Sequence, residues 1–277
     1  MSAVSKFMQR AILGAATVTT LLMATQVQAQ NATTWQDVRK AGVLRCGFAA
    51  SPPWTIHDPK TDSHDGLFAD LCRNFGEKVL KVKVEFVNTT WDNIVAGLQS
   101  NKWDLSLSLN DTPERRKAIS FSQGAVEYSV NFVYNKKNPK FKTVPKSLAD
   151  IDKPGVTVAV MSGTVQDKSA TAALKNATIM RLPGFDETRL ALMSKRADLL
   201  ADDTGTNALL LAAQPDWAVA MNPEPKLAPQ WIAFGVRKEQ PEADVAQFNA
   251  YLADQLKSGE VDRLVKAAVK LSLKQTQ

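Results

Sequence analysis

The chain has 277 residues, 44% of them hydrophobic, and a formal net charge of +6, which suits one large or two modest domains with an ordinary core. Charges of both signs are scattered along it, and this pattern excludes nucleic acid as an expected partner. The two His residues are too few for a metal centre, so no metal or other cofactor is expected.

The first 29 residues have the pattern of an export signal. Lys6 and Arg10 form a basic segment, residues 11–24 an apolar core, and Val27–Ala29 a small-residue cleavage site. The apolar core is shorter than the roughly 20 residues that a membrane-spanning helix needs. We therefore expect cleavage after Ala29 and a protein that works in the periplasm, with a net charge lowered by two, to +4.

Strand-like and helix-like segments alternate along the rest of the chain, which indicates an α/β fold with mostly parallel sheets. The first half predicts strands at 43–48, 82–87 and 104–110, and helices at 66–79 and 92–99. In the strand at 104–110, leucines at 105, 107 and 109 alternate with polar residues at 106, 108 and 110. This alternation predicts a half-buried strand whose polar face could look into a cleft.

A second run of the same kind follows a basic, Pro-containing connector at 135–155. It predicts strands at 156–160, 179–182 and 199–201, and helices at 166–174, 186–194 and 206–214. Two amphipathic helices at 245–256 and 261–271, separated by Ser258 and Gly259, end the chain. Two α/β units joined by extended segments predict two lobes.

The cysteines and histidines each allow two interpretations. Cys46 and Cys72 lie in an exported chain, where an oxidising compartment favours a disulfide; the alternative is two buried thiols that pack as small hydrophobes. His57 and His64 lie in a segment rich in Asp and Pro. Their spacing is poor for metal ligands, and we expect both to be solvent-exposed loop residues.

Three turns that follow predicted strands are candidate ligand contacts, because ligands of open α/β sheets bind at the carboxyl ends of the strands. Ser108 and Asn110 end one strand, and Arg115 stands in the first turn of a helix that begins at Pro113 with Thr112 as its N-cap. A cation at the positive end of a helix dipole is unfavourable, so an anion is expected nearby. The guanidinium geometry suits a carboxylate; the alternative is a solvated arginine.

The other two turns add an anion site and an acid. In "MSGTVQD", at 161–167, Gly163 lets the backbone approach closely, and the Thr164 hydroxyl and the helix-start N–H groups can bind an anion; the alternative is an ordinary capped turn. Asp202 and Asp203 lie where a predicted strand meets a helix, as an N-cap or as partners for a ligand ammonium. Together the three turns complement an α-amino acid.

Six segments in matching order resemble the periplasmic solute-binding proteins of polar-amino-acid ABC importers. They are "GVLRCGFAASPPW" (42–54), "DGLFADLCRNFGEKV" (65–79), "WDNIVAGLQSNKWDLSLS" (91–108), "TPERRKAISFS" (112–122), "VAVMSGT" (158–164) and "FGVRKEQPE" (234–242). The resemblance implies the type II periplasmic-binding-protein fold, with two lobes of mostly parallel sheet flanked by helices and a ligand clamped between them by hinge closure. The implied lobes are 30–127 with 233–277, and 128–232, joined by strands near Glu127–Tyr128 and Trp231–Ile232.

The resemblance also implies roles for single residues. It places Arg115 on the ligand α-carboxylate, with Thr164 and the Val165 amide completing that site. Asp203 falls at the position that binds the ligand ammonium, and Trp91 at the position that packs on the ligand. The cysteine positions resemble a paired version of the family in which a bridge ties the first strand to the first helix.

The chain departs from the family pattern at three positions near the expected ligand. Ala49 and Ser51 stand where many relatives carry an acidic residue and an aromatic one, and Asn110 replaces a small hydroxyl. Trp54 could move inward to replace the missing ring, or could pack structurally beside Pro53; we count it and Ser51 among the candidate contacts. A small carboxylate-bearing ligand is therefore expected rather than any particular amino acid.

An enzyme is the alternative, because the family also includes cyclohexadienyl dehydratase, a periplasmic lyase. That reaction needs a general acid. The corresponding turn here carries Val165 and Gln166, and Asp167 could serve only if the turn were shifted. No catalytic nucleophile motif is present. We therefore expect a monomeric binding protein that delivers a small amino acid or related carboxylate to an inner-membrane ABC permease.

Overall fold

The computed structural model describes residues 34–141 and 143–275. The predicted export signal and its cleavage site lie outside these residues. Within the described chain, no helix is both long enough and apolar enough to cross a bilayer.

A mixed ten-stranded sheet runs through the described chain, in the order β4-β1-β5-β12-β7-β10-β8-β9. Strands β4, β1 and β5 are parallel to one another, as are β10, β8 and β9, while β7 and β12 run antiparallel to their neighbours. β6 pairs with β12, and β11 pairs with β7. In chain order the strands are β1 Val43–Phe48, β4 Lys83–Asn88, β5 Leu105–Asn110, β6 Ile119–Phe121, β7 Val126–Asn135, β8 Thr157–Met161, β9 Thr178–Leu182, β10 Leu199–Asp203, β11 Ala218–Met221 and β12 Leu227–Arg237.

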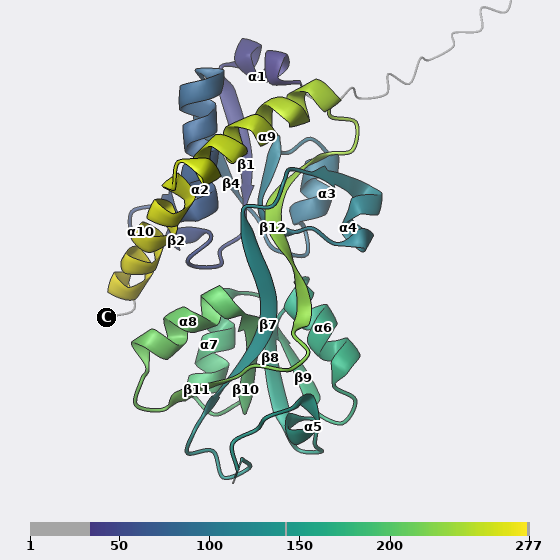
Figure 1. The fold of residues 1–277 in the computed structure, drawn as a ribbon, viewed down its shortest axis with the longest axis vertical. Helices are drawn as coiled ribbons and strands as arrows, with labels where there is room; N and C mark the ends of the chain where they lie inside the picture. The colour runs from purple at the N-terminus through teal and green to yellow at the C-terminus, as the bar shows by residue number, and fades with distance from the viewer. Residues whose placement is uncertain (1–33, 142, 276–277) are drawn as a thin grey trace, which may run out of the picture. The chain divides into compact units, whose positions relative to one another are not determined.

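The two long strands β7 and β12 join the halves of this sheet (Figure 1). They pair with each other, with Glu127 opposite Trp231. β12 also pairs with β5, and β7 also pairs with β10. We call the elements around β1, β4 and β5 the first lobe and those around β8, β9 and β10 the second lobe. The strands expected near 127–128 and 231–232 to cross between the lobes are present.

Helices cover the sheet in both lobes (Figure 1). The first lobe carries α1 Trp35–Ala41, α2 Leu67–Asn74, α3 Ile94–Gln99, α4 Pro113–Ala118, α9 Glu242–Lys257 and α10 Glu260–Gln275. The second lobe carries α5 Leu148–Ile151, α6 Val165–Ala173, α7 Phe185–Met193 and α8 Thr204–Ala213. The alternating pattern of strands and helices expected from the sequence is confirmed.

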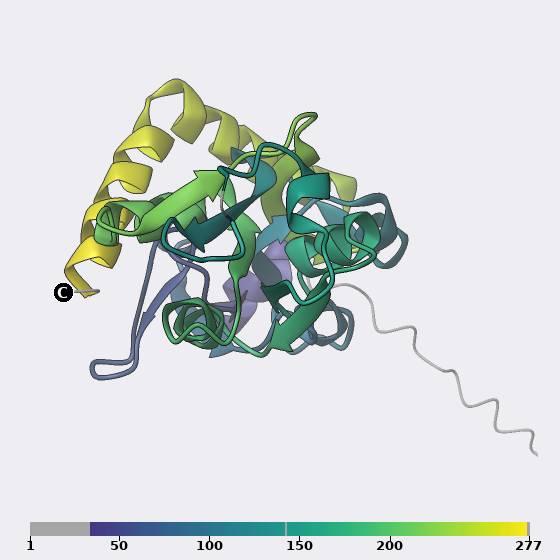
Figure 2. The ribbon, with the colours of Figure 1, turned by 90° about the horizontal axis from the view of Figure 1, so that it is seen from below.

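The C-terminal helices α9 and α10 (yellow in Figure 2) return to the first lobe. There α10 packs against α2, and it also contacts α8 of the second lobe. The Trp35 indole N–H donates to the Asp244 backbone oxygen at 2.7 Å, and the Tyr251 hydroxyl donates to the Leu71 oxygen at 3.0 Å. Phe248 is fully buried and contacts the rings of Trp35 and Phe75. Burying a side chain of this size stabilises a fold by about 1.5–3 kcal/mol, so residues far apart in sequence hold this lobe together.

The predicted helix at 66–79 has two parts. The α-helix α2 ends at Asn74, and a π-helix, η1, follows over Phe75–Leu80 and ends at Lys81, whose φ is +61°. The apolar spacing of the sequence does not distinguish the two helix types. The strand that was expected at 199–201 extends to Asp203.

The prediction that the strand at 104–110 is half-buried was wrong. All six residues of β5 are buried, because β1 and β12 flank the strand and helices cover it. The Ser106 hydroxyl accepts a hydrogen bond from Trp103 Nε1 at 2.8 Å and donates one to the Ile94 oxygen at 3.0 Å. Ser106 is therefore a structural residue, and only the polar positions 108 and 110 reach a cavity.

The prediction that His57 and His64 are exposed loop residues was also wrong. They lie in a two-stranded hairpin of β2 Ile56–Asp58 and β3 Ser63–Asp65, directly opposite each other and half-buried. The residues between the strands, which suggested a loop, form only the turn.

Cys46 of β1 and Cys72 of α2 form a disulfide, and both are fully buried. The expected bridge between the first strand and the following helix is confirmed, and the alternative of two free thiols is wrong.

Candidate ligand-binding site

Residues from both lobes and from the crossing strands enclose a cavity of about 20 Å³. Eight of the nine predicted contacts line it: Ser51, Trp54, Trp91, Ser108, Asn110, Arg115, Thr164 and Asp203. Val165 is not among the lining residues, and its side chain packs in the hydrophobic core; the predicted contact is its backbone amide, at the N-terminus of α6, and it stays a prediction. The prediction missed Tyr128, Met161, Gln166 and Ile232. Tyr128 and Ile232 lie in the crossing strands. Because these strands were expected to pass between the lobes, their residues could have been included among the candidate contacts.

Arg115 lies at the start of α4, where its backbone N–H donates to the N-cap oxygen of Thr112 at 3.1 Å. Its guanidinium donates to the backbone oxygens of Asn110 and Gly163, at 3.2 and 3.5 Å. Among the described residues, no carboxylate forms an ion pair with it. Burial lowers the pKa of Arg115, since the charged form lacks solvent, and an anion in the cavity would offset this cost.

Two further donors beside Arg115 are buried with no hydrogen-bond partner in the described chain. They are Trp91 Nε1 and Asn110 Nδ2, and both residues line the cavity. A buried donor without an acceptor costs about 1–3 kcal/mol. The guanidinium and these two donors therefore belong to residues that line one cavity, and donors of this kind bind the oxygen atoms of a carboxylate.

The backbone is strained at Ser108, which lines the same cavity. Its φ is +56°, in the left-handed region that residues with a Cβ rarely adopt. Strain of this kind costs about 1–3 kcal/mol and collects at functional sites. It orients the end of β5, from which Ser108 and Asn110 reach the cavity.

The turn at 161–167, which was predicted to bind an anion, contains Thr164, the N-cap of α6. The Thr164 hydroxyl accepts from Asp167 N at 3.3 Å and donates to the Met161 oxygen at 2.5 Å. The hydroxyl proton of Thr164 is therefore already used in a hydrogen bond within the turn. Gly163, with φ +75°, lies so close to the first lobe that a Cβ would be 2.5 Å from Asp92 Oδ1.

Asp203 is the N-cap of α8 and contacts the first lobe. Its Oδ1 accepts from Gly205 N at 2.9 Å, from Thr206 N at 2.8 Å and from Trp54 Nε1 at 3.0 Å. Trp54 points inward to the second lobe: its ring lies where a Cβ on Gly205 would be 2.3 Å from it, and it lines the cavity. Since all three donors use Oδ1, Oδ2 is left for a ligand.

Comparison with known proteins shows the family of the chain. Residues 44–269 match the family model of bacterial extracellular solute-binding proteins, family 3. The chain belongs to this family.

Relatives of this solute-binding protein include both binders and an enzyme. A probable amino-acid ABC transporter periplasmic-binding protein of Sinorhizobium fredii is 26% identical over 249 residues, which cover 86% of this chain and 80% of the relative. Cyclohexadienyl dehydratase of Pseudomonas aeruginosa is 26% identical over 192 residues, 66% of this chain and 67% of the enzyme.

A solved structure confirms the type II periplasmic-binding-protein fold. It is that of an ancestral amino acid-binding protein described as a precursor of cyclohexadienyl dehydratase, with a TM-score of 0.75 and 31% identity, covering 85% of this chain and 99% of that one.

A hydrogen-bond network lies on the acidic side of the cavity. The Tyr128 hydroxyl donates to Gln166 Oε1, and Gln166 Nε2 donates to Asp202 Oδ1, both at 2.8 Å. Burial and the neighbouring Asp203 carboxylate raise the pKa of Asp202 to about 8. Burial also raises the pKa of Asp203. Near neutral pH the pair therefore carries less than two negative charges.

Replacing Asp202 by asparagine should remove a pH-dependent part of the stability. Because the folded pKa of Asp202 is about 8 and its ordinary value is 3.8, the native state binds more protons between these values. Its contribution is fully present below the lower value and is lost as pH rises through the higher one. We expect the melting temperature of Asp202→Asn to gain on the wild type from pH 5 to pH 8.

Thermal unfolding at both pH values measures this effect, with Asp254→Asn, at an exposed position of α9, as the control. A difference between Asp202→Asn and the wild type that stays constant from pH 5 to pH 8 would contradict the raised pKa.

Contacts between the lobes hold the solute-binding protein in a closed arrangement. Lys168 Nζ of α6 lies 2.6 Å from Glu114 Oε2 of α4, and the Ser162 hydroxyl lies 3.4 Å from Asp92 Oδ1. The Lys168–Glu114 pair is exposed, and such pairs contribute about 0–1 kcal/mol. This ion pair can therefore break at small cost when the lobes open.

Proposed function

We propose that this protein captures a small amino acid or a related small carboxylate between its lobes and delivers it to an ABC permease of the inner membrane. The observation that carries the proposal is the Arg115 guanidinium, half-buried beside the unpartnered donors of Trp91 and Asn110. Membership of the solute-binding family and the amino-acid-binding relatives support it. We further propose that the protein acts as a monomer in the periplasm.

Lobe borders at 127/128 and 232/233, with 30–127 and 233–277 forming one lobe and 128–232 the other, belong to the same proposal. Both borders fall within the paired strands β7 and β12, where a hinge can act without breaking either lobe. The return of α9 and α10 to the first lobe supports the assignment of 233–277.

The closed arrangement leaves too little room for an amino acid. In the closed arrangement about 20 Å³ is free, little more than one water molecule occupies. Trp54 accounts for part of this, because its indole extends from the first lobe to Asp203. Binding of even a small amino acid therefore requires the lobes to separate or Trp54 to move.

We propose capture rather than catalysis, with the lyase as the alternative. Gln166 occupies the turn where a general acid would be needed, and its amide already donates to Asp202 and accepts from Tyr128. Asp167 forms an ion pair with Arg181 at 3.0 Å. These contacts leave neither residue as a proton donor to the cavity.

A thermal-shift screen of the chain from Gln30 onward tests the proposal, with amino acids, small amines and small carboxylates as ligands. At 100 times its Kd a ligand stabilises the folded state by about 2.7 kcal/mol, a shift of several degrees for a protein of this size. We expect every hit to carry a carboxylate and to be recovered chemically unchanged. Hits only among amines would contradict the proposed role of Arg115, and a converted ligand would favour the lyase.

Asp203→Asn separates ligands that carry an amine from those that do not. Asparagine is as good an N-cap as aspartate, so α8 and the contact from Trp54 are retained while the charge is lost. We expect amine-bearing ligands to bind at least about tenfold more weakly, since bonds to charged groups contribute about 1.5–3 kcal/mol, and carboxylates without an amine to change less. Calorimetric titration measures both; equal weakening of the two ligand classes would refute the role of Asp203.

A further inference from the structure

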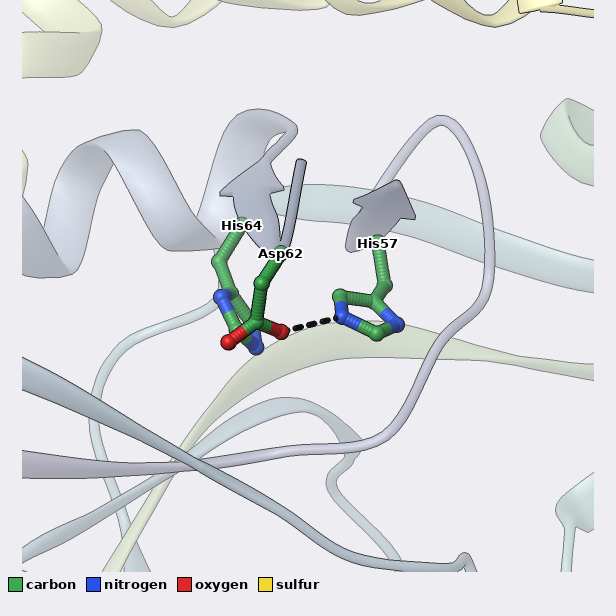
Figure 3. Close-up of side chains that lie close together, drawn as sticks. All are labelled: His57, Asp62 and His64. Carbon is green, nitrogen blue, oxygen red and sulfur yellow. Dashed lines mark hydrogen bonds and ion pairs between the residues drawn. The ribbon is translucent and has the colours of Figure 1, made fainter. Parts of the chain in front are cut away.

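The β2–β3 hairpin brings together three side chains whose chemistry has no part in ligand capture. His57 and His64 are direct cross-strand partners, so their rings lie on the same side of the hairpin, with centroids 4.8 Å apart. Asp62, in the turn, adds a carboxylate whose Oδ1 lies 2.8 Å from His57 Nε2 (Figure 3). One ligand atom from each residue lies within 4.8 Å of the other two.

We propose that His57, Asp62 and His64 form a binding site for a divalent transition-metal ion of the Zn²⁺ type. Two imidazoles and one carboxylate are the ligands that Zn²⁺ prefers, whereas Ca²⁺ and Mg²⁺ prefer oxygen atoms alone. Three protein ligands leave at least one position for water, so the ion exchanges with solvent. The two histidines are seven residues apart, a spacing that does not suggest a metal site in the sequence. Only the register of the hairpin brings them together.

The surroundings of His64 hold its ring in place before an ion arrives. The ring stacks on Phe86 with centroids 5.2 Å apart and meets the edge of Phe48 at 4.8 Å. His64 Nε2 lies 2.8 Å from Asn88 Oδ1 of β4. Since an amide oxygen only accepts, Nε2 carries the proton in this contact and Nδ1 keeps its lone pair. A hydrogen bond of this kind on the second ring nitrogen is the usual support of a metal-binding histidine.

A metal ion can replace the proton in the hydrogen bond between His57 Nε2 and Asp62 Oδ1. Zn–N and Zn–O bonds of about 2.0–2.2 Å require the two atoms to move apart slightly from 2.8 Å. Asp62 can make this movement because its side chain is 79% exposed. The other acids of the hairpin, Asp58 and Asp65, occupy the alternate positions and so point to the opposite face.

Titration of the full exported chain, prepared without a histidine tag, with ZnCl₂ tests the site. We expect one Zn²⁺ per chain, and at least about tenfold weaker binding in His57→Gln, His64→Gln and Asp62→Asn. Asp58→Asn, on the opposite face of the same hairpin, should bind as the wild type does. None of these residues lines the Arg115 cavity, so ligand affinity serves as a check that each variant is folded.

Two results would overturn the proposal. One is undiminished Zn²⁺ binding in the double variant His57→Gln/His64→Gln, which would place the ion elsewhere. The other is no binding to the wild type at millimolar Zn²⁺. Co²⁺ offers a second measurement, because its visible absorption should report nitrogen and oxygen ligands in the wild type and that signal should vanish in the double variant.

Discussion

Replacing Arg115 by alanine should weaken binding of a carboxylate ligand by two to three orders of magnitude. Removing one partner of a buried charged pair costs about 2–5 kcal/mol, because the ligand carboxylate would then lie in the cavity opposite Trp91 and Asn110 alone. The stability of the ligand-free protein should change little. The guanidinium forms no ion pair with a described carboxylate, its hydrogen bonds to the Asn110 and Gly163 oxygens are long, at 3.2 and 3.5 Å, and burial already disfavours its charge. Calorimetric titration and thermal unfolding measure the two effects.

Arg116→Ala is the matched control, because the neighbouring guanidinium is exposed and pairs with Asp111. It should leave affinity within about twofold of the wild type, as surface substitutions change little. Arg115→Lys should recover only part of the loss, since an ammonium is a point charge without the planar fork of donors. Wild-type affinity in Arg115→Ala would show that the carboxylate binds elsewhere and would contradict the proposed site.

The location of Arg115 could be predicted because its signal is local. A cation in the first turn of a capped helix, directly after a strand, conflicts with the helix dipole wherever the helix lies in the fold. Asp203 was likewise found from its place between a strand and a helix, although sequence alone left its cap and ligand roles open. The structure shows that Asp203 is the N-cap of α8. Its role as a ligand contact, for which Oδ2 is available, stays a prediction.

The contact of Trp54 with Asp203 could not be predicted, because it depends on how the second lobe meets the first. The same holds for Gln166, whose network with Tyr128 and Asp202 joins three segments far apart in sequence. Local patterns also do not reveal how many neighbours a strand has. The alternation in β5 suggested one solvated face, but β1 and β12 enclose the strand and only its end meets the cavity.

Many helices and strands of the two lobes were predictable because their hydrophobic periods are distinctive. The patterns missed short elements, such as β6 and α5, and the β2–β3 hairpin, which depends on pairing. They also missed the two longest strands, β7 and β12, which were expected only near 127–128 and 231–232 and only from the family resemblance. The composition of that hairpin indicated a loop, while its stability comes from aromatic contacts with Phe48 and Phe86, which lie in separate strands. For such segments tertiary contacts override local preference.

Removing the Cys46–Cys72 disulfide should lower the free energy of unfolding by about 3.5 kcal/mol in the chain-entropy model, given its sequence separation of 26. For a protein of this size that corresponds to a fall of about 7–14 °C in melting temperature. The double variant Cys46→Ala/Cys72→Ala is preferable to serine, because both positions are fully buried and a serine hydroxyl there would add a desolvation cost. Thermal unfolding with and without reductant measures the loss.

The bridge acts as one unit, which gives the experiment its internal control. Each single alanine variant should lose about as much stability as the double variant, since either change breaks the same bond. Reductant should lower the melting temperature of the wild type and leave the double variant unchanged. Neither cysteine lines the ligand cavity, so ligand affinity at a temperature where the variant is folded should stay within about twofold. A fall of less than 2 °C, or a loss of affinity without a loss of stability, would contradict a purely structural role for the bridge.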